Sequence, residues 1–153
     1  MDGVSAKEIR KMELEGRIAL VTGGSLGIGR ATVLALAREG ADVAFTYYGF
    51  RHRADEAQEV VAEVQKLGRQ CVAVESDVSK FSEAQRIVQN IVNDLGGLHI
   101  LVNNAGISHD GVIWKMDEEQ WDTVLSVNLK GCFNYLRAVS PIFREQKWGK
   151  IVN

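Results

Sequence analysis

Short apolar runs alternate along this chain with longer segments in which apolar residues recur every three or four positions. A short run without polar alternation predicts a β-strand covered on both faces, whereas the longer spacing predicts a helix with one buried face. Each of the first four expected strands is followed by one expected helix. The expected strands are residues 17–22, 42–47, 71–75, 99–102 and 150–153.

The segments between these strands carry signals that begin and end helices. Ser82 followed by Gln85 predicts a capping box, and Asp117 is the expected N-cap of the last helix. Pro141 is expected to kink or end that helix. The other helices are expected over 30–39, 53–67 and 82–95, closed by Gly40, Gly68 and Gly96.

This alternation predicts the fold class. Strands separated by helices of such length need crossover connections, and crossovers join parallel strands. The pattern therefore predicts an α/β fold, a doubly wound parallel sheet with helices on both faces. Other α/β strand orders, such as the flavodoxin-like one, stay open at this point, because periodicity does not specify the order of the strands.

Length, charge and cysteine content limit the classes of partner and site that the protein is expected to have. The length of 153 residues favours one domain, and 18 basic against 20 acidic residues give a net charge of −2. This balance argues against nucleic-acid and membrane partners. Residues 1–15 lack the apolar core of a secretory signal. Cys71 and Cys132 have no metal-ligand spacing and fit a reduced, cytoplasmic setting better than a disulfide, so we expect no metal site.

The turn between the first strand and the first helix is rich in glycine. Glycine allows positive φ and close approach of a phosphate, and the amides that begin the next helix favour an anion. The Gly-x3-Gly-x-Gly spacing is a variant of the dinucleotide fingerprint. Taken alone, it also fits a tight turn that binds no ligand. The turn reads Thr22-Gly23-Gly24-Ser25-Leu26-Gly27-Ile28-Gly29.

The end of the second strand indicates which dinucleotide is bound. An NAD site usually has an acidic residue there, on the ribose 2′-hydroxyl. Residues 45–53 contain no carboxylate, and Arg51 and Arg53 follow the strand. Guanidinium groups suit a 2′-phosphate, so NADP is favoured over NAD, with Arg51 or Arg53 binding that phosphate. Alternatively, both arginines are solvated residues at the start of a helix.

Three further motifs follow in order. Asp77-Val78 follows the third strand, Asn103-Asn104-Ala105-Gly106 follows the fourth, and Asn128 lies in the long helix. With the glycine turn, they resemble the classical short-chain dehydrogenase/reductase family over nearly the whole chain from Met12. Residues 16–23 and the stretch after Gly106 are most similar to 3-oxoacyl-(acyl-carrier-protein) reductases, although sugar and alcohol dehydrogenases of the family share these segments. The resemblance implies a Rossmann-like sheet of order 3-2-1-4-5, incomplete on its C-terminal side.

The resemblance also implies roles for the matching residues. Gly23, Gly24, Ser25, Leu26, Gly27, Ile28 and Gly29 would line the phosphate and ribose region. Tyr48 would lie on the adenosine ribose side, near Arg51. Leu26 departs from the basic residue that many NADP-dependent members carry within this turn.

On the other side of the expected cleft, Asp77 would accept a hydrogen bond from the adenine amino group, beside Val78. Asn104, Ala105 and Gly106 would pass the central ribose of the cofactor. Asn128 would hold a water molecule in the proton relay behind the catalytic lysine.

The family's catalytic Tyr-x3-Lys pair is not found in these residues. Tyr47 and Tyr48 lie at the second strand, and Tyr135 is followed by Val139 at the fourth position. The resemblance places this pair and the catalytic serine beyond Asn153. We therefore expect residues 12–153 to be the N-terminal part of a longer dinucleotide-binding Rossmann domain, preceded by a polar extension at 1–11.

Two classes of function stay open. One is an NADP-dependent oxidoreductase that transfers a hydride to a small carbonyl substrate, such as a 3-oxoacyl thioester carried by acyl-carrier protein or the ketone of another alcohol or sugar dehydrogenase. Full-length family members of this kind are homo-oligomeric. The other is a fragment that binds nucleotide without turnover. We expect the 153-residue polypeptide itself to be inactive as a reductase, because the acid catalyst is absent from it.

Overall fold

The computed structural model describes residues 12–50 and 53–153. The expected extension at 1–11 and the candidate phosphate-binding residue Arg51 lie outside the described residues. Within residues 12–50 and 53–153, no helix is long and apolar enough to cross a membrane.

Five parallel strands form one sheet, in the order β3-β2-β1-β4-β5. The prediction of a doubly wound sheet with order 3-2-1-4-5 is confirmed. The order reverses between β1 and β4, and in such sheets ligands bind at the carboxyl ends of the strands beside this reversal. The strands are β1 (Ile18–Val21), β2 (Asp42–Tyr47), β3 (Cys71–Glu75), β4 (Ile100–Val102) and β5 (Lys150–Val152).

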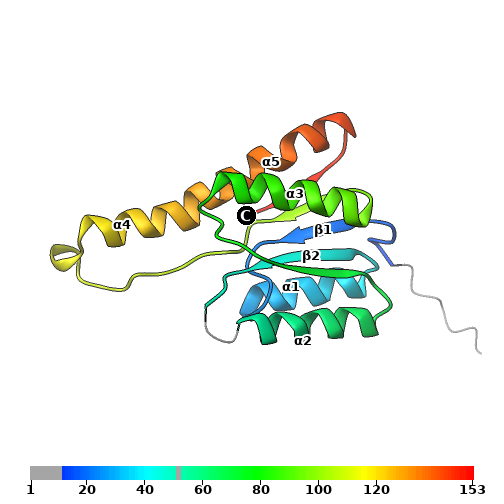
Figure 1. Ribbon diagram of the computed structural model, residues 1–153, viewed down its shortest axis with the longest axis horizontal. Coiled ribbons are helices and arrows are strands. Elements are labelled where there is room, and N and C mark those ends of the chain that lie inside the picture. Colours follow the sequence, from blue (N-terminus) through cyan, green and yellow to red (C-terminus); the bar gives the residue numbers. More distant parts are fainter. Residues whose placement is uncertain (1–11, 51–52) are drawn as a thin grey trace, which may run out of the picture.

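Helices cover both faces of this sheet (Figure 1). α1 and α2 lie on one face and α3 and α5 on the other, while α4 extends beyond the edge of the sheet. A short 3-10 turn, η1, precedes α4, and a π-helical segment, η2, joins α4 to α5 without a break. The helices are α1 (Gly27–Arg38), α2 (Arg53–Lys66), α3 (Phe81–Leu95), η1 (Ile113–Lys115), α4 (Glu118–Leu125), η2 (Ser126–Lys130) and α5 (Gly131–Glu145).

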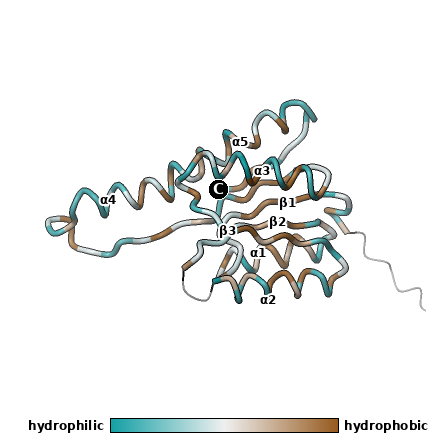
Figure 2. Tube along the Cα trace, viewed as in Figure 1, coloured by the Kyte–Doolittle hydropathy of each residue, from teal (hydrophilic) through white to brown (hydrophobic). Residues whose placement is uncertain are grey.

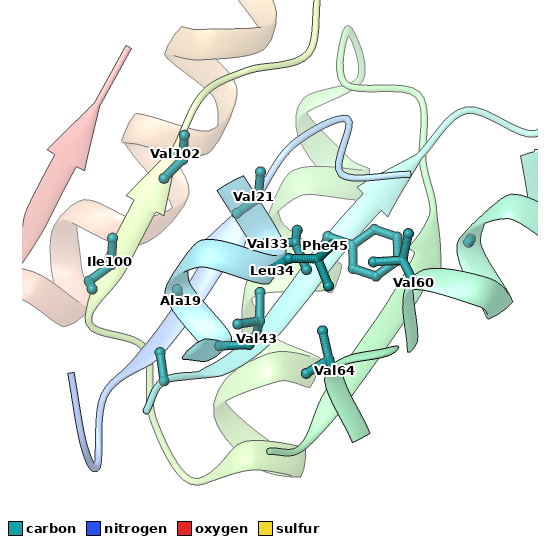
Figure 3. Close-up of a cluster of buried hydrophobic side chains, with 13 residues drawn as sticks. Ala19, Val21, Val33, Leu34, Val43, Phe45, Val60, Val64, Ile100 and Val102 are labelled. Carbon is teal, nitrogen blue, oxygen red and sulfur yellow. The ribbon is translucent and has the colours of Figure 1, made fainter. Parts of the chain in front are cut away.

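Two apolar cores result, one on each face of the sheet. Alternate residues of a strand point to opposite faces, so Val43 and Phe45 of β2 join the core beneath α1 and α2, whereas Ala44 joins the core beneath α3 and α5. Figure 3 shows the first core, with Phe45 beside Val33 of α1 and Val60 of α2. Figure 2 shows the strands as the most continuously hydrophobic part of the fold. The central strands are covered on both faces as predicted, but β5 is exposed, because it forms the edge of the sheet.

Two of the predicted helix starts are wrong. α3 begins at Phe81 with Lys80 as its N-cap, and Ser82 does not cap it. The first turn is held instead by Glu83, whose carboxylate accepts from the amide of Asp77 at 2.8 Å. α1 begins at Gly27 rather than Arg30, because the end of the glycine turn is already helical.

The cap predicted for the last helix is confirmed. The Asp117 side chain accepts from the amide of Gln120 at 2.7 Å, and the Gln120 side chain accepts in return from the amide of Asp117. Of the two outcomes expected at Pro141, an end of the helix is wrong, since α5 continues to Glu145, and a kink stays a prediction. A proline inside a helix removes one backbone hydrogen bond, and the packing of Tyr135 and Val139 in the core outweighs that loss.

His99, just before β4, contacts the adjacent edge of β1. Its Nδ1 accepts from the amide of Ile18 at 3.0 Å, so this nitrogen must be unprotonated. Trp148 lies edge-on to the imidazole and stacks under the guanidinium of Arg17. Burial, together with the positive charge of Arg17, lowers the pKa of His99 below its ordinary value.

This contact predicts a fall in stability in weak acid. Because the folded-state pKa of His99 is depressed, the unfolded chain takes up the proton first, as the pH falls through about 6.5, and stability is lost from there downward. Urea unfolding between pH 8 and pH 5 measures the effect. His99→Asn, whose side-chain oxygen replaces Nδ1, should flatten the dependence. The same change at the exposed His109 should leave it intact, and an unchanged slope in His99→Asn would contradict the prediction.

Candidate functional site

A cleft of about 830 Å³ lies at the carboxyl ends of β1, β2, β3 and β4. Four loops and the start of η2 meet around it, as expected where the order of the strands reverses. Its size is that of a cofactor site. It is lined by Gly23, Ser25, Leu26, Gly27, Ile28, Gly29, Thr46, Tyr47, Tyr48, Phe50, Arg53, Ser76, Asp77, Val78, Ser79, Asn104, Ala105, Gly106, Ile107, Thr123, Ser126 and Val127.

The three glycines of the Gly-x3-Gly-x-Gly spacing serve two different needs. Gly23 and Gly27 have φ values of +69° and +52°, a region that side chains other than glycine rarely adopt. Gly29 lies in the first turn of α1, where a Cβ would overlap the carbonyl oxygen of Gly23 and lie 2.5 Å from Nδ2 of Asn104. The turn is therefore folded tightly against α1. Gly24 does not line the cleft; its missing side chain makes room for Phe45 in the core.

Thr22 and Asn104 join the glycine turn to the loop after β4. The Thr22 hydroxyl accepts from the amides of Asn104 and Ala105, both at 3.0 Å. In return, the Asn104 side-chain nitrogen donates to the carbonyls of Thr22 and Gly23, both at 3.0 Å. Thr22 is buried, so these bonds are shielded from water. The two walls of the cleft are thus held at a fixed separation.

The start of α1 faces the cleft without a side-chain cap. Leu26 occupies the N-cap position and makes no capping hydrogen bond with any residue the structure describes. The first amides of a helix have no partner within it. The residues that carry these amides, Gly27, Ile28 and Gly29, line the cleft at the positive end of the helix dipole, where an anionic group is favoured.

Asp77 forms the opposite wall, between β3 and α3. One carboxylate oxygen accepts from the amide of Ser79 at 3.0 Å and from its hydroxyl at 2.6 Å, and the other lies 3.5 Å from the ammonium of Lys80. Burial opposes ionisation, but the bonds from Ser79 and the charge of Lys80 outweigh it and lower the pKa of Asp77. The group is therefore a carboxylate at neutral pH, able to accept a further hydrogen bond.

At the end of β2, aromatic and basic side chains surround the mouth of the cleft. Tyr48 and Phe50 are both largely exposed. Arg53, the first residue of α2, lines the cleft and pairs with Glu56 at 3.2 Å. Its side chain is about 40% exposed, so the guanidinium can still contact a ligand.

Asn128 lies in η2, beside the loop that follows β4. Its Oδ1 accepts from the amide of Ile107 at 2.8 Å and its Nδ2 donates to the carbonyl of Ile107 at 2.9 Å. Gly106 packs against the same amide group. Asn128 does not line the cleft, and in the structure it positions this loop. Its predicted role in a proton relay stays a prediction.

The structure brings most of the predicted site residues to one cleft and adds others. Of the predicted residues it describes, only Gly24 and Asn128 are outside the lining. Thr46 and Ser76 were not predicted, although both are buried hydroxyl residues in the lining. The signal that could have identified them is a polar residue at the carboxyl end of an otherwise apolar strand. No group of three or more potential metal ligands is found in residues 12–50 and 53–153.

Comparison with known proteins agrees with this geometry. The sequence profile of the short chain dehydrogenase family matches residues 17–153. The 3-oxoacyl-(acyl-carrier-protein) reductase of Staphylococcus epidermidis is 42% identical over 135 residues, which are 88% of this chain and 54% of that protein. The protein of the same name from Thermotoga maritima is 37% identical over 142 residues, 93% of this chain and 56% of that protein. The chain thus spans about half the length of these relatives.

Solved structures give the same result. NAD⁺-bound xylitol dehydrogenase superposes with a TM-score of 0.86 at 30% identity, over 92% of this chain and 53% of that one. A short-chain type dehydrogenase/reductase from Mycobacterium marinum gives 0.85 at 30% identity, over 92% of this chain and 56% of that one.

Proposed function

This chain belongs to the short-chain dehydrogenase family, and we propose that its cleft binds NADP for hydride transfer to a ketone such as a 3-oxoacyl thioester. The observation that carries the proposal is the convergence of the glycine turn, Asp77 and the 104–106 loop on one cleft. Titrating the 153-residue chain with NADPH, followed by cofactor fluorescence, tests it directly.

The residues present fit a dinucleotide. The uncapped amides of α1 would hold the pyrophosphate, because the residues that carry them line the cleft at the end of the helix that favours anions. The Asp77 carboxylate would accept from the adenine amino group, and the 104–106 loop would border the central ribose. The nicotinamide supplies the hydride when it is bound. This chain contributes binding, orientation and the exclusion of water.

A preference for NADP over NAD rests on the end of β2. No acidic residue stands between Phe45 and Arg53, whereas Arg53 and Tyr48 both line the cleft. Arg51, outside the described residues, is the second candidate for the 2′-phosphate. Leu26 in the turn supplies no charge, so the preference depends on these arginines.

Removing the guanidinium of Arg53 tests this preference. We expect Arg53→Ala to weaken NADPH binding about tenfold, because a charge-assisted hydrogen bond to the phosphate is lost, and to leave NADH binding unchanged. Arg38→Ala is the matched control, because Arg38 lies in the last turn of α1 and does not line the cleft. Arg51→Ala is measured alongside. Tighter binding of NADH than NADPH by the unaltered chain would count against the whole proposal.

The proposed substrate is a 3-oxoacyl thioester carried by acyl-carrier protein. It is supported by the two reductases of that name at 42% and 37% identity. The xylitol dehydrogenase match supports a second candidate, an alcohol or sugar dehydrogenase. Substrate competition between acetoacetyl thioester and xylulose, in the whole enzyme, separates the two.

The 153-residue chain itself is proposed to bind nucleotide without turnover. It contains no Tyr-x3-Lys pair: Tyr47 and Tyr48 lie at the end of β2, and Tyr135 is fully buried in the core, so none of the three matches the family's acid. We expect NADPH oxidation with acetoacetyl thioester to stay at the blank rate. Turnover above that rate by this polypeptide would refute the prediction.

The proposed enzyme is a cytoplasmic homo-oligomer. An exposed apolar row on α4, η2 and α5, which includes Trp121, Leu129 and Phe133, supports self-association, because a patch of this kind is rarely left in water. Sedimentation of the whole protein tests it, and a monomer at micromolar concentration would contradict it.

A further inference from the structure

We infer that Asn134 and Tyr135 of α5 are positioning residues for the adenine side of the cleft, acting through the loop that carries Asp77. The inference rests on the proposed binding of a dinucleotide. Neither residue lines the cleft, and both are fully buried. Both belong to α5, which contacts Ser76 and Val78 of the 76–78 loop.

Tyr135 holds the first residue of this loop. Its hydroxyl lies 3.1 Å from the hydroxyl of Ser76, and Thr46 of β2 is a second polar neighbour that lowers its pKa. Burial raises the pKa of Tyr135 to about 12, although the neighbouring hydroxyls of Ser76 and Thr46 act in the opposite direction. The phenol therefore stays protonated and remains a hydrogen-bonding hydroxyl throughout the physiological range.

The same hydroxyl is connected to the glycine turn. Thr46 accepts from the amide of Gly23 through its hydroxyl, at 3.3 Å, and from the amide of Gly24 through its carbonyl, at 2.9 Å. Thr46, whose hydroxyl influences the pKa of Tyr135, is thus the residue of β2 on which the turn rests.

Asn134 holds the third residue of the loop. Its Nδ2 donates to the carbonyl of Val78 at 2.8 Å, while its Oδ1 has no hydrogen-bond partner among the described residues. A buried amide oxygen without a partner destabilises the fold. One turn earlier on α5, Gly131 packs so closely on Val78 that a Cβ would lie 3.0 Å from Cγ2 of that valine.

These contacts fix Asp77 without touching it. Ser76 is bound to Tyr135 and Val78 to Asn134, so the residue between them has both of its neighbours tied to one helix. The Asp77 carboxylate is then held by Ser79 and Lys80 on its own loop. A preorganised acceptor binds more tightly than a mobile one, because less conformational freedom is lost on binding.

Two variants test the inference in the full 153-residue chain. Tyr135→Phe removes one hydroxyl, and Asn134→Leu removes the donor together with the unpartnered oxygen. We expect each to weaken binding of NADPH about fivefold, and of adenosine 2′,5′-bisphosphate by the same factor, because both probes carry the adenine. Ser140→Ala, on the exposed side of the same helix, should change neither affinity.

Two readouts separate positioning from a general loss of structure. Asn134→Leu should melt close to the temperature of the unaltered chain, since removal of the unpartnered oxygen offsets the lost bond to the Val78 carbonyl, and it therefore serves if Tyr135→Phe does not fold. In an Asp77→Ala background, both affinity losses should disappear, because the group being positioned is absent.

Unaltered affinity in a folded variant would overturn the inference, as would losses that persist in the Asp77→Ala background. Failure of the unaltered chain to bind either probe would instead overturn the proposed function.

Discussion

Gly29→Ala is expected to lower the free energy of unfolding by about 2–3 kcal/mol. The added Cβ would overlap the carbonyl oxygen of Gly23, and that oxygen belongs to backbone that is itself held by Asn104. Relief requires the glycine turn to move away from α1. The first amides of α1 would then no longer be aligned with a pyrophosphate in the cleft, and we expect the affinity for NADPH to fall about tenfold or more.

Gly68→Ala is the matched control for this prediction. Gly68 also has positive φ, at +76°, but a Cβ there meets no atom within 4 Å, and the residue lies at the end of α2, outside the cleft lining. Backbone strain should cost about 1–2 kcal/mol and leave NADPH binding unchanged. Urea unfolding and fluorescence titration measure the two effects separately. Wild-type affinity in Gly29→Ala would show that the close approach of turn and helix is not needed for binding.

Thr22→Val is expected to destabilise the chain by about 2–4 kcal/mol, with little change in shape. The substitution replaces a buried hydroxyl by a methyl group and removes the acceptor for the amides of Asn104 and Ala105. Each donor left without a partner costs about 1–3 kcal/mol. The loop after β4 should loosen as well, so hydrogen exchange at these two amides should accelerate more than the global loss of stability explains.

Thr32→Val provides the comparison. The Thr32 hydroxyl donates to the carbonyl of Ile28 on an exposed part of α1, so its loss leaves no buried group unpaired. Its effect should stay within about 0.5 kcal/mol. Equal stability of Thr22→Val and Thr32→Val would show that water satisfies the two amides, and the proposed rigidity of the cleft would then be wrong.

Features encoded in a few neighbouring residues could be predicted from the sequence. The N-cap at Asp117 depends only on the residues of one helical turn, and the glycine turn needs only eight residues. Strand order came from the resemblance carried by the glycine turn, Asp77, Asn104 and Asn128, since periodicity alone left it open. The cleft followed, because parallel strands bring their carboxyl ends to one edge.

Features that depend on contacts between distant residues could not be predicted. Ser82 and Gln85 have the spacing of a cap, yet α3 begins one residue before Ser82, because Glu83 binds the amide of Asp77. The contact of Tyr135 with Ser76 depends on how α5 lies on the sheet. A buried tyrosine in an apolar helix face reads in sequence as an ordinary core residue.

The contact between Thr22 and Asn104 also has a consequence for the order of folding. The two residues are 82 positions apart, so the contact closes a long loop and forms only after β4 has taken its place beside β1. Neither the glycine turn nor the 104–106 loop has its final shape before then. During synthesis, the growing chain can therefore bind nucleotide only after residue 105 has left the ribosome and β4 has paired, however early the first strand and helix are made.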